Sequence, residues 1–288
     1  MAISRAQLAK ELEPGLNALF GLEYGRYENE HSEIFDEESS DRAFEEEVML
    51  GGFSTAPSKG EGTAISFDEA RETYTARYTH ETIALAFSIT EEAIEDNLYD
   101  RLASRYTKAL ARSMAQTKQI KAAAILNNAF LAGANAIGDG VALCSNAHPS
   151  LSGNQTNLLA TAADLNETSL EQMLIDIAGL TDERGLKIAV RGTKLIIPKE
   201  LQFIAERVLN SNLRSGTADN DNNAMKNMGM LPEGAVVNHF LTDTDAYFIK
   251  TDAPNGFKYF NRSAIKTAME GDFDTGNMRF KARERYSF

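Results

Sequence analysis

The chain has 288 residues, 43% of them hydrophobic, and a formal net charge of −13. This is enough for a sizeable folded core in one or two domains. No apolar run approaches the roughly 20 residues of a membrane helix, and the N-terminus lacks a signal-peptide apolar region, so we expect a soluble protein made in a cytoplasm, with no membrane partner. A single cysteine, Cys144, excludes an internal disulfide, and the four histidines show no paired metal-ligand spacing. The negative charge argues against attraction to free nucleic acid, so the expected partners are proteins.

The first part of the chain predicts a short helix followed by an acidic arm. Residues 5–20 carry apolar side chains at helical spacing, and Pro14 leaves open an interruption within that helix. Between Glu28 and Glu47 there are ten acidic residues against one base, Arg42. A solvated segment is the simplest interpretation. The alternative is an arm that docks on a basic neighbour. Its isolated apolar residues are Ile34, Phe35 and Phe44.

Residues 48–89 have the pattern of strands and turns. Glycines at 51, 52, 60 and 62 are followed by an alternating run at 73–79 and by apolar residues at every second position from Ile83 to Phe87. This pattern predicts a long β-hairpin with a glycine-rich tip. Because an isolated hairpin is only marginally stable, it must pack either on its own domain or on a neighbouring subunit.

The next segment predicts one uninterrupted helix from about Thr90 to Phe130. Thr90 suits an N-cap, and two glutamates follow in the first turn. Apolar residues recur at every fourth position, at Ile94, Leu98, Leu102, Tyr106, Leu110 and Met114. Neither proline nor glycine occurs between Thr90 and Gly133. Such a helix of about 40 residues would be roughly 60 Å long. The alternative is two helices joined near residues 117–121, where the apolar stripe weakens.

Helices and strands alternate in residues 136–245. A capping box is predicted at residues 168–171, ahead of a helical face formed by Leu170, Met173, Leu174 and Ile177. Residues 187–190 and 194–197 are strand-like, and Pro198 suits the first position of a further helix. The polar, asparagine-rich residues 210–227 predict an exposed loop.

Strands return at residues 235–240, 246–250, 257–260 and 278–288. In the last of these, alternation predicts one basic and one apolar face. The basic face would carry Arg279, Lys281, Arg283 and Arg285, and the apolar face Phe280, Ala282, Tyr286 and Phe288.

No motif in the sequence supports catalysis or a cofactor. The glycine pairs at 60/62 and 138/140 lack the lysine and serine of a Walker loop and the Rossmann fingerprint, so turns are expected. Cys144 and His148 could suggest a nucleophile and a base, but a buried cysteine beside a turn is the commoner arrangement. We therefore predict no catalytic, cofactor-binding or metal-binding residues, and no enzyme.

Several stretches resemble one known family. The runs YTARYTHET (74–82) and FSITEEAIEDNLY (87–99) look like the passage from an extended loop into a spine helix, and ILNNAF (125–130) and ALCSNAHP (142–149) look like the segments that follow. The order of arm, hairpin, long helix, mixed insert and returning strands is also similar. The chain thus resembles the major capsid proteins of tailed bacteriophages with the Hong Kong 97-type fold, an α+β fold, over about residues 47–288.

The resemblance implies an N-terminal arm (1–46), an extended loop (47–89), a peripheral domain with the spine helix (90–135), an axial domain (136–245) and peripheral return strands (246–288). It implies self-assembly, as hexamers and pentamers, into an icosahedral head shell that encloses double-stranded DNA without sequence-specific binding. A separate scaffolding protein, a portal and decoration proteins would be partners. The protein would be assembled in the host cytoplasm and end in the virion.

Charge complementarity suggests how copies could meet. We predict that the acidic arm, through Glu37, Glu38, Glu45 and Glu46, lies on a neighbour's basic strand formed by Arg279, Lys281, Arg283 and Arg285. Two other classes of function stay open. A decoration or tail-tube subunit would usually be shorter and without so long a helix, and a soluble enzyme would need a cluster of perturbed titratable groups.

Overall fold

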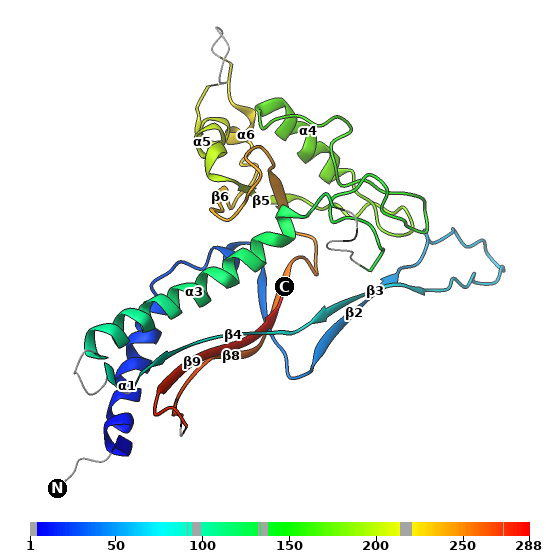
Figure 1. The fold of residues 1–288 in the computed structure, drawn as a ribbon. Coiled ribbons are helices and arrows are strands. Elements are labelled where there is room, and N and C mark those ends of the chain that lie inside the picture. The colour runs from blue at the N-terminus through cyan, green and yellow to red at the C-terminus, as the bar shows by residue number, and fades with distance from the viewer. Residues whose placement is uncertain are drawn as a thin grey trace. The chain divides into compact units, whose positions relative to one another are not determined.

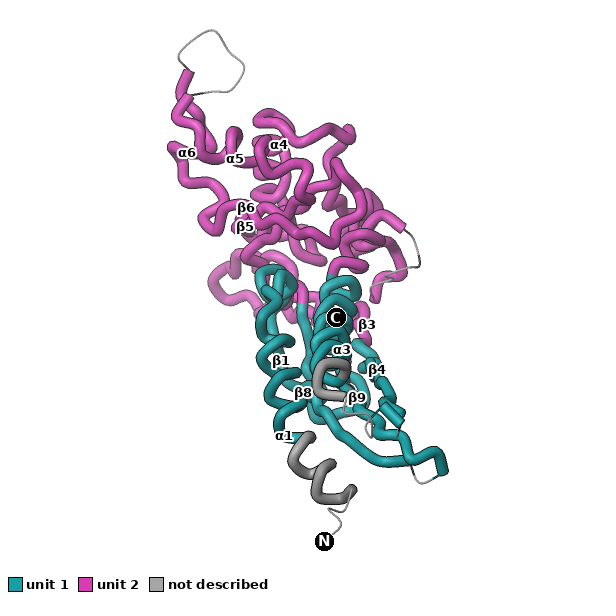
Figure 2. Tube along the Cα trace, turned by 60° about the vertical axis from the view of Figure 1, so that its left-hand side comes forward, with its two compact units in different colours: residues 1–44, 78–122, 258–288 teal, residues 45–77, 123–257 magenta. Residues whose placement is uncertain are grey.

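The computed structural model describes residues 5–90, 92–93, 99–131, 133, 138–213, 221–272 and 274–288. The chain divides into two compact units, each assembled from segments far apart in the sequence (Figure 2). Unit 1 contains residues 1–44, 78–122 and 258–288, and unit 2 contains residues 45–77 and 123–257. Both units combine helices with a sheet, as the α+β prediction requires (Figure 1).

Unit 1 is built on a four-stranded sheet with the order β1-β8-β9-β4. The strands are β1 (Asp36–Ser39), β4 (Glu81–Ile89), β8 (Lys258–Gly271) and β9 (Met278–Ser287). β1 runs parallel to β8, and the other pairs are antiparallel. The helices α1 (Arg5–Tyr24) and α3 (Tyr99–Asn127) cover one face, where Phe20 and Met114 pack with Phe280. A 3₁₀ turn, η1 (Glu30–Glu33), leads from α1 toward β1.

The first helix is longer than predicted, because α1 continues through Pro14 to Tyr24. Leu16 and Phe20 are its buried apolar residues in the described part. β1 was not predicted, since its four residues are polar and all exposed. Of the three apolar residues expected in the arm, Ile34 and Phe35 are buried, whereas Phe44 is 39% exposed.

The predicted long helix is present as α3, and it runs without a break through residues 117–121, so the two-helix alternative is wrong. It ends at Asn127, three residues before the predicted end at Phe130, and turns follow. At its predicted start, Thr90 Oγ1 accepts a hydrogen bond from the Ala93 amide at 3.4 Å, as an N-cap would. The connection through residues 94–98 lies outside the described residues.

The apolar stripe predicted along this helix was partly wrong. Tyr106 is 49% exposed, although Leu110 and Met114 are buried as expected. Spacings of three and four residues alternate on a helix with 3.6 residues per turn, so a strict four-residue repeat leaves the buried face. The side chains of Ile94, Leu98 and Leu102 are outside the described part. The buried face instead contains Ala103, Thr107, Leu110, Ala111, Met114 and Ala115.

Unit 2 is built on a three-stranded sheet with the order β6-β5-β7. The strands are β5 (Gly192–Ile197), β6 (Ala235–Val237) and β7 (Phe248–Thr251), and the helices are α4 (Glu167–Ala178), α5 (Gln202–Asn210) and α6 (Ala224–Asn227). Leu195 and Ile197 pack with α4 and α5 in an apolar core. Pro198 precedes a 3₁₀ turn, η2 (Lys199–Leu201), which leads directly into α5.

Two local predictions in unit 2 were wrong. The capping box of α4 is formed by Asn166 and Ser169, two residues before the predicted one, because an asparagine side chain caps the first turn equally well. Residues 187–190 are not a strand, since Ala189 has a positive φ of 53° that breaks extended structure. The expected loop at 210–227 also contains the short helix α6, and its residues 214–220 lie outside the described part.

The predicted hairpin is formed by β2 (Phe44–Gly51) and β3 (Arg71–Thr79), which pair as a separate two-stranded sheet. The strand predicted at residues 83–87 exists as β4, but it pairs with β9 of unit 1 and is not part of the hairpin. One residue, His80, separates β3 from β4. Its ring nitrogens lie 2.8 Å from Ser40 Oγ and 2.9 Å from Ser287 Oγ, so it joins the ends of β1 and β9 in unit 1.

Candidate assembly surfaces

β9 has the two faces that the sequence predicted. Arg279, Lys281 and Arg283 are exposed and Arg285 is half-buried, while Phe280 and Ala282 on the other face are buried. Together with Lys266, which lies opposite Arg283 on β8, the four basic residues of β9 form what we call the basic face of unit 1.

The basic face has few charge partners of its own. Small residues of β4 lie opposite its cations in register: Ala84 faces Arg283, Ala86 faces Lys281, and Ser88 faces Arg279. Among the described residues, Arg279 forms an ion pair with Asp272, whereas Lys266, Lys281 and Arg283 form none. This sheet face therefore presents unpaired positive charge in a chain that is strongly negative overall.

The covered face of β9 contains a buried charge that the sequence analysis missed. Glu284 is 1% exposed, and its carboxylate lies 2.8 Å from Lys118 Nζ and accepts a hydrogen bond from the Tyr24 hydroxyl at 3.0 Å. Lys118 also lies 5.2–5.7 Å from the ring centres of Tyr24, Tyr259 and Tyr286. The sequence did contain a signal, because Glu284 alternates with the basic residues and so lies on the same face of the strand as Phe280, Ala282 and Tyr286. A glutamate on a covered face needs a buried cation as its partner.

This ion pair perturbs the surrounding tyrosines. Burial, and then the negative charge of Glu284, raise the pKa of Tyr24, Tyr259 and Tyr286 well above the ordinary tyrosine range. All three tyrosines therefore stay protonated. The arrangement fixes α1, α3 and β9 against one another rather than preparing a group for proton transfer.

The acidic arm lies partly against its own unit. His31 is buried and its backbone amide donates to Gln119 Oε1 at 3.0 Å, next to the buried Ile34 and Phe35. Glu38 pairs with Lys258 at 3.3 Å, and Glu37 accepts a hydrogen bond from Asn261 at 3.4 Å. β8 separates β1 from β9, so Glu37 and Glu38 do not reach the basic face of their own chain.

Glu45 and Glu46 belong to unit 2, on strand β2. Glu46 pairs with Arg77 of the neighbouring strand β3 at 2.5 Å. Glu38 and Glu46 thus already have a cationic partner in the chain. Both pairs are partly exposed and therefore contribute little to stability.

The β2–β3 hairpin, which we call the arm of unit 2, exposes a series of large apolar side chains. Phe67 is 97% exposed, Ile65 70% and Phe53 60%. Val48, Met49 and Leu50 of β2 are exposed as well. Exposed apolar surface of this kind on a two-stranded sheet is typical of sites of protein–protein contact.

The root of this arm is firmly attached within unit 2. The Arg184 guanidinium donates to the carbonyl oxygens of Gly52 and Glu69, at 3.1 and 2.6 Å, and so holds both ends of the tip loop. Tyr74 donates to the Pro149 carbonyl at 2.9 Å. A Cβ atom at Gly138 would lie 2.9 Å from the Thr75 backbone, so glycine is required for this close approach.

The residues that could have suggested catalysis have structural roles. His148 Nδ1 contacts Asp139 at 2.6 Å rather than Cys144, and burial raises the pKa of the Cys144 thiol to about 11. Both suspected glycine loops are turns, with φ of 77° at Gly62 and 78° at Gly140. Within the described ranges, no three His, Cys, Asp or Glu residues are grouped to hold a metal ion, and no helix is long and apolar enough to cross a membrane.

Comparison with known proteins agrees with this picture. A family model described as phage capsid protein matches residues 73–288. The fold is similar to that of the bacteriophage JBD30 capsid, with 13% identity and a TM-score of 0.57 over 75% of this chain and 92% of that chain. The JBD30 capsid decorated with minor capsid protein trimers gives 12% identity and a TM-score of 0.52 over 73% and 89%. No curated protein sequence matches.

Proposed function

Because the chain belongs to the phage capsid protein family and has the Hong Kong 97-type fold of tailed-phage major capsid proteins, we propose a specific contact through which its copies associate. The protein is a major capsid protein that builds the head shell of a phage, and it is a component of the virion. Its role is structural. In the proposed contact, the acidic arm of one copy lies on the basic face of the next.

The observation that carries this contact is the uneven distribution of charge. Residues 28–47 carry ten acidic residues and one arginine, whereas the basic face carries five cations, four of which have no ion pair among the described residues. Glu37, Glu38, Glu45 and Glu46 of one copy would contact Lys281 and Arg283 of the next, and would exchange or share the partners that they have within their own chain. Such complementarity sets the register of a contact more than its affinity.

The arm of unit 2 supports the same conclusion. Its apolar side chains Phe53, Ile65 and Phe67 are exposed in the isolated subunit, and a second copy would cover them. Many thin contacts of this kind allow each one to be weak, so that errors can be corrected while the shell forms.

The remaining parts of the proposal concern the form of the assembly and its partners. Copies would form hexamers and pentamers in the host cytoplasm, with a separate scaffolding protein, a portal and decoration proteins as partners. The shell would enclose double-stranded DNA without sequence-specific binding, for which its net charge of −13 is suited. We propose no catalytic activity.

Charge reversal tests the contact. Lys281→Glu with Arg283→Glu should leave the subunit folded, because both side chains are exposed, and should abolish shells in negative-stain electron microscopy. The matched control is Arg105→Glu with Lys108→Glu, two exposed cations on α3, which should assemble normally. Normal shells from the first variant would contradict the contact.

A further inference from the structure

The sheet of unit 2 has a cavity near each of its two edges, because β6 and β7 are the edge strands on either side of β5. A cavity of about 550 Å³ lies beside α5 and β6 and is lined by Ile197. A second cavity, of about 700 Å³, lies beside α4 and β7 and is lined by Ile196. Unit 2 therefore has two different surfaces, at opposite edges of its sheet.

The cavity on the Ile196 side is apolar with an acidic margin. Met173, Ile177 and Phe248 line it and are only half-buried, as is Cys144. The other described residues that line it include four aspartates, Asp164, Asp176, Asp243 and Asp245, and neither lysine nor arginine. A cavity of this size and polarity is suited to an apolar group that carries positive charge beside it.

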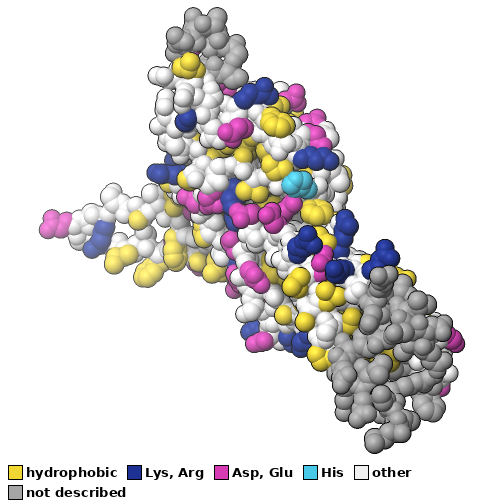
Figure 3. Space-filling view, turned by 90° about the vertical axis from the view of Figure 1, so that its left-hand side faces the viewer, with side chains coloured by type: hydrophobic (Ala, Val, Ile, Leu, Met, Phe, Trp, Pro, Cys, Tyr) yellow, Lys and Arg dark blue, Asp and Glu magenta, His cyan; other side chains and the backbone are white. Residues whose placement is uncertain are grey.

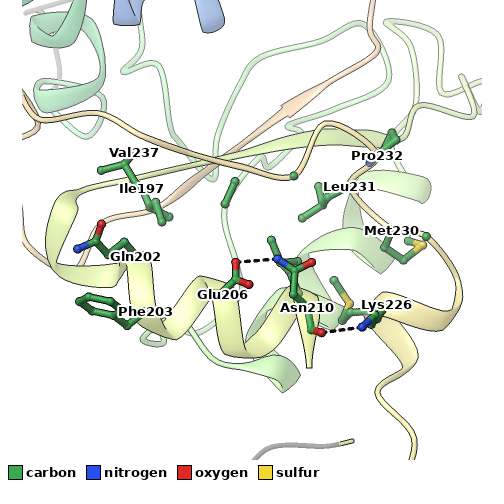
Figure 4. Close-up of a pocket in the computed structure, with 15 residues that line it drawn as sticks. Ile197, Gln202, Phe203, Glu206, Asn210, Lys226, Met230, Leu231, Pro232 and Val237 are labelled. Atoms are coloured by element: carbon green, nitrogen blue, oxygen red, sulfur yellow. Dashed lines mark hydrogen bonds between the residues drawn. The ribbon is translucent and has the colours of Figure 1, made fainter. Parts of the chain in front are cut away.

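The surface at the other edge of the sheet presents such a group on α5. Phe203 is 70% exposed, and Lys199 and Arg207 lie four residues before and after it. Figure 4 shows the Phe203 ring directed away from Leu231 and Met230, so it does not fill the neighbouring hollow. Figure 3, which faces the side that carries α5, shows hydrophobic side chains next to Lys and Arg side chains.

The cations beside Phe203 are available for a new contact. Lys199 lies 3.6 Å from Glu200, and both side chains are exposed, so this pair is weak. Arg207 Nε donates to the Phe203 carbonyl at 3.0 Å, which leaves the other guanidinium nitrogens free to meet carboxylates.

We propose that copies of unit 2 associate head to tail, with Phe203 of one copy entering the Ile196 cavity of the next and Lys199 and Arg207 meeting its aspartates. This inference rests on the proposed shell function and specifies one contact within a ring of subunits. A contact between two different patches of one body repeats from copy to copy and closes into a ring when the rotation between copies closes, whereas a self-complementary patch would stop at a dimer.

Other exposed apolar side chains fit the cavity less well. Ile188 also has basic neighbours, but its amide bonds to the Leu180 carbonyl, and Leu180 lines the same cavity, so the loop lies on the cavity's own side. Phe67 precedes Asp68 and Glu69, whose charges would repel the aspartates. Phe203 is thus the best match in both charge and position.

Crosslinking tests the geometry, because Cys144 lines the cavity and is the chain's single cysteine. Phe203→Cys adds a second thiol beside the other cavity. A crosslink within one chain would leave the chain monomeric on a denaturing gel, so covalent oligomers report only links between copies. A short bismaleimide added to assembled shells should give a ladder of covalent oligomers on a denaturing gel. Leu22→Cys, 71% exposed on α1, is the matched control and should give no ladder.

In a separate sample of dissociated subunits, both thiols must react with a monofunctional maleimide in near-neutral buffer. The reaction of Cys144 should be the slower one, because burial raises the pKa of its thiol to about 11. Shells of Phe203→Cys without a ladder would overturn the inference, and so would an equal ladder from Leu22→Cys. Failure of the unmodified protein to form shells would instead contradict the proposed function.

Charge reversal provides a second, independent measurement. Lys199→Glu with Arg207→Glu should lower the yield of shells at least tenfold and leave the circular dichroism spectrum of the subunit unchanged. Lys187→Glu with Arg191→Glu changes two other exposed cations of unit 2 and should assemble normally. Equal yields from the two double variants would overturn the head-to-tail contact.

Discussion

β9 of unit 1 and β5 of unit 2 are both interior strands, but they are built differently. β5 ends in Leu195, Ile196 and Ile197, all 0% exposed, so it is covered on both faces. β9 is covered on one face, where it carries the buried Glu284, and leaves the other face open with its cations. In the proposed contacts, unit 1 would therefore use one open side of its sheet, whereas unit 2 would use surfaces at the edges of a sheet that is itself buried.

The largest effect is expected where β9 departs most from β5, at the buried ion pair. Lys118→Met leaves Glu284 buried without a cation and should lower the free energy of unfolding of the subunit by about 3–5 kcal/mol. Urea denaturation of dissociated subunits measures this change. The double variant Lys118→Met with Glu284→Leu should recover much of the loss. A single variant as stable as the unmodified protein would show that the pair is not buried in solution.

A smaller loss is expected from the apolar core around β5. Leu195→Ala removes a fully buried side chain that packs with α4 and α5, and should cost about 3 kcal/mol through lost burial and the remaining cavity. Amide hydrogen exchange should increase in β5, β6 and β7 with little change in β9. Leu213→Ala, at a 46% exposed position in the same unit, is the control and should have little effect. Equal exchange in β9 would contradict a separate core.

The stability of unit 1 should depend on pH through the buried His31. Burial, and then the charge of Lys118, lower the pKa of His31 below its ordinary 6.5, although Gln119 and Glu37 act in the opposite direction. The unfolded chain then binds more protons at His31 than the folded chain, so stability is full above about pH 6.5 and falls as the pH drops below it. Urea midpoints of the unmodified protein and His31→Gln, compared from neutral to mildly acidic pH, measure this contribution. Equal slopes would contradict it.

The smallest effect on stability is expected at the open face of β9. Arg283→Thr changes an exposed residue without an ion pair in the described part of the chain, so the free energy of unfolding should change by less than about 0.5 kcal/mol. The yield of shells should nevertheless fall. A variant that unfolds more easily by several kcal/mol would indicate that Arg283 supports the fold rather than a contact between copies.

Which sequence predictions were right depends on whether a feature is set by neighbouring residues or by partners far away in the chain. The two faces of β9 and the strand at residues 194–197 were predictable, because period-two patterns and apolar runs depend only on local geometry. The stripe along α3 failed at Tyr106, since the buried face depends on which partners the helix meets. β1 was missed because its residues are polar, and only pairing with β8 makes them a strand. The predicted domain boundaries and the contact between the acidic arm and the basic face stay predictions.

By itself, the sequence determined the α+β class, the long helix, the acidic arm, the basic strand and the resemblance to capsid proteins. Each of these can be recognised from local spacing, from composition or from short runs of residues. The tertiary structure decided that β4 pairs with β9 rather than with the hairpin, that Glu284 meets Lys118, and that Ile196 and Ile197 open onto two different hollows. These features join residues up to 260 positions apart, such as Tyr24 and Glu284, and packing alone brings such residues together.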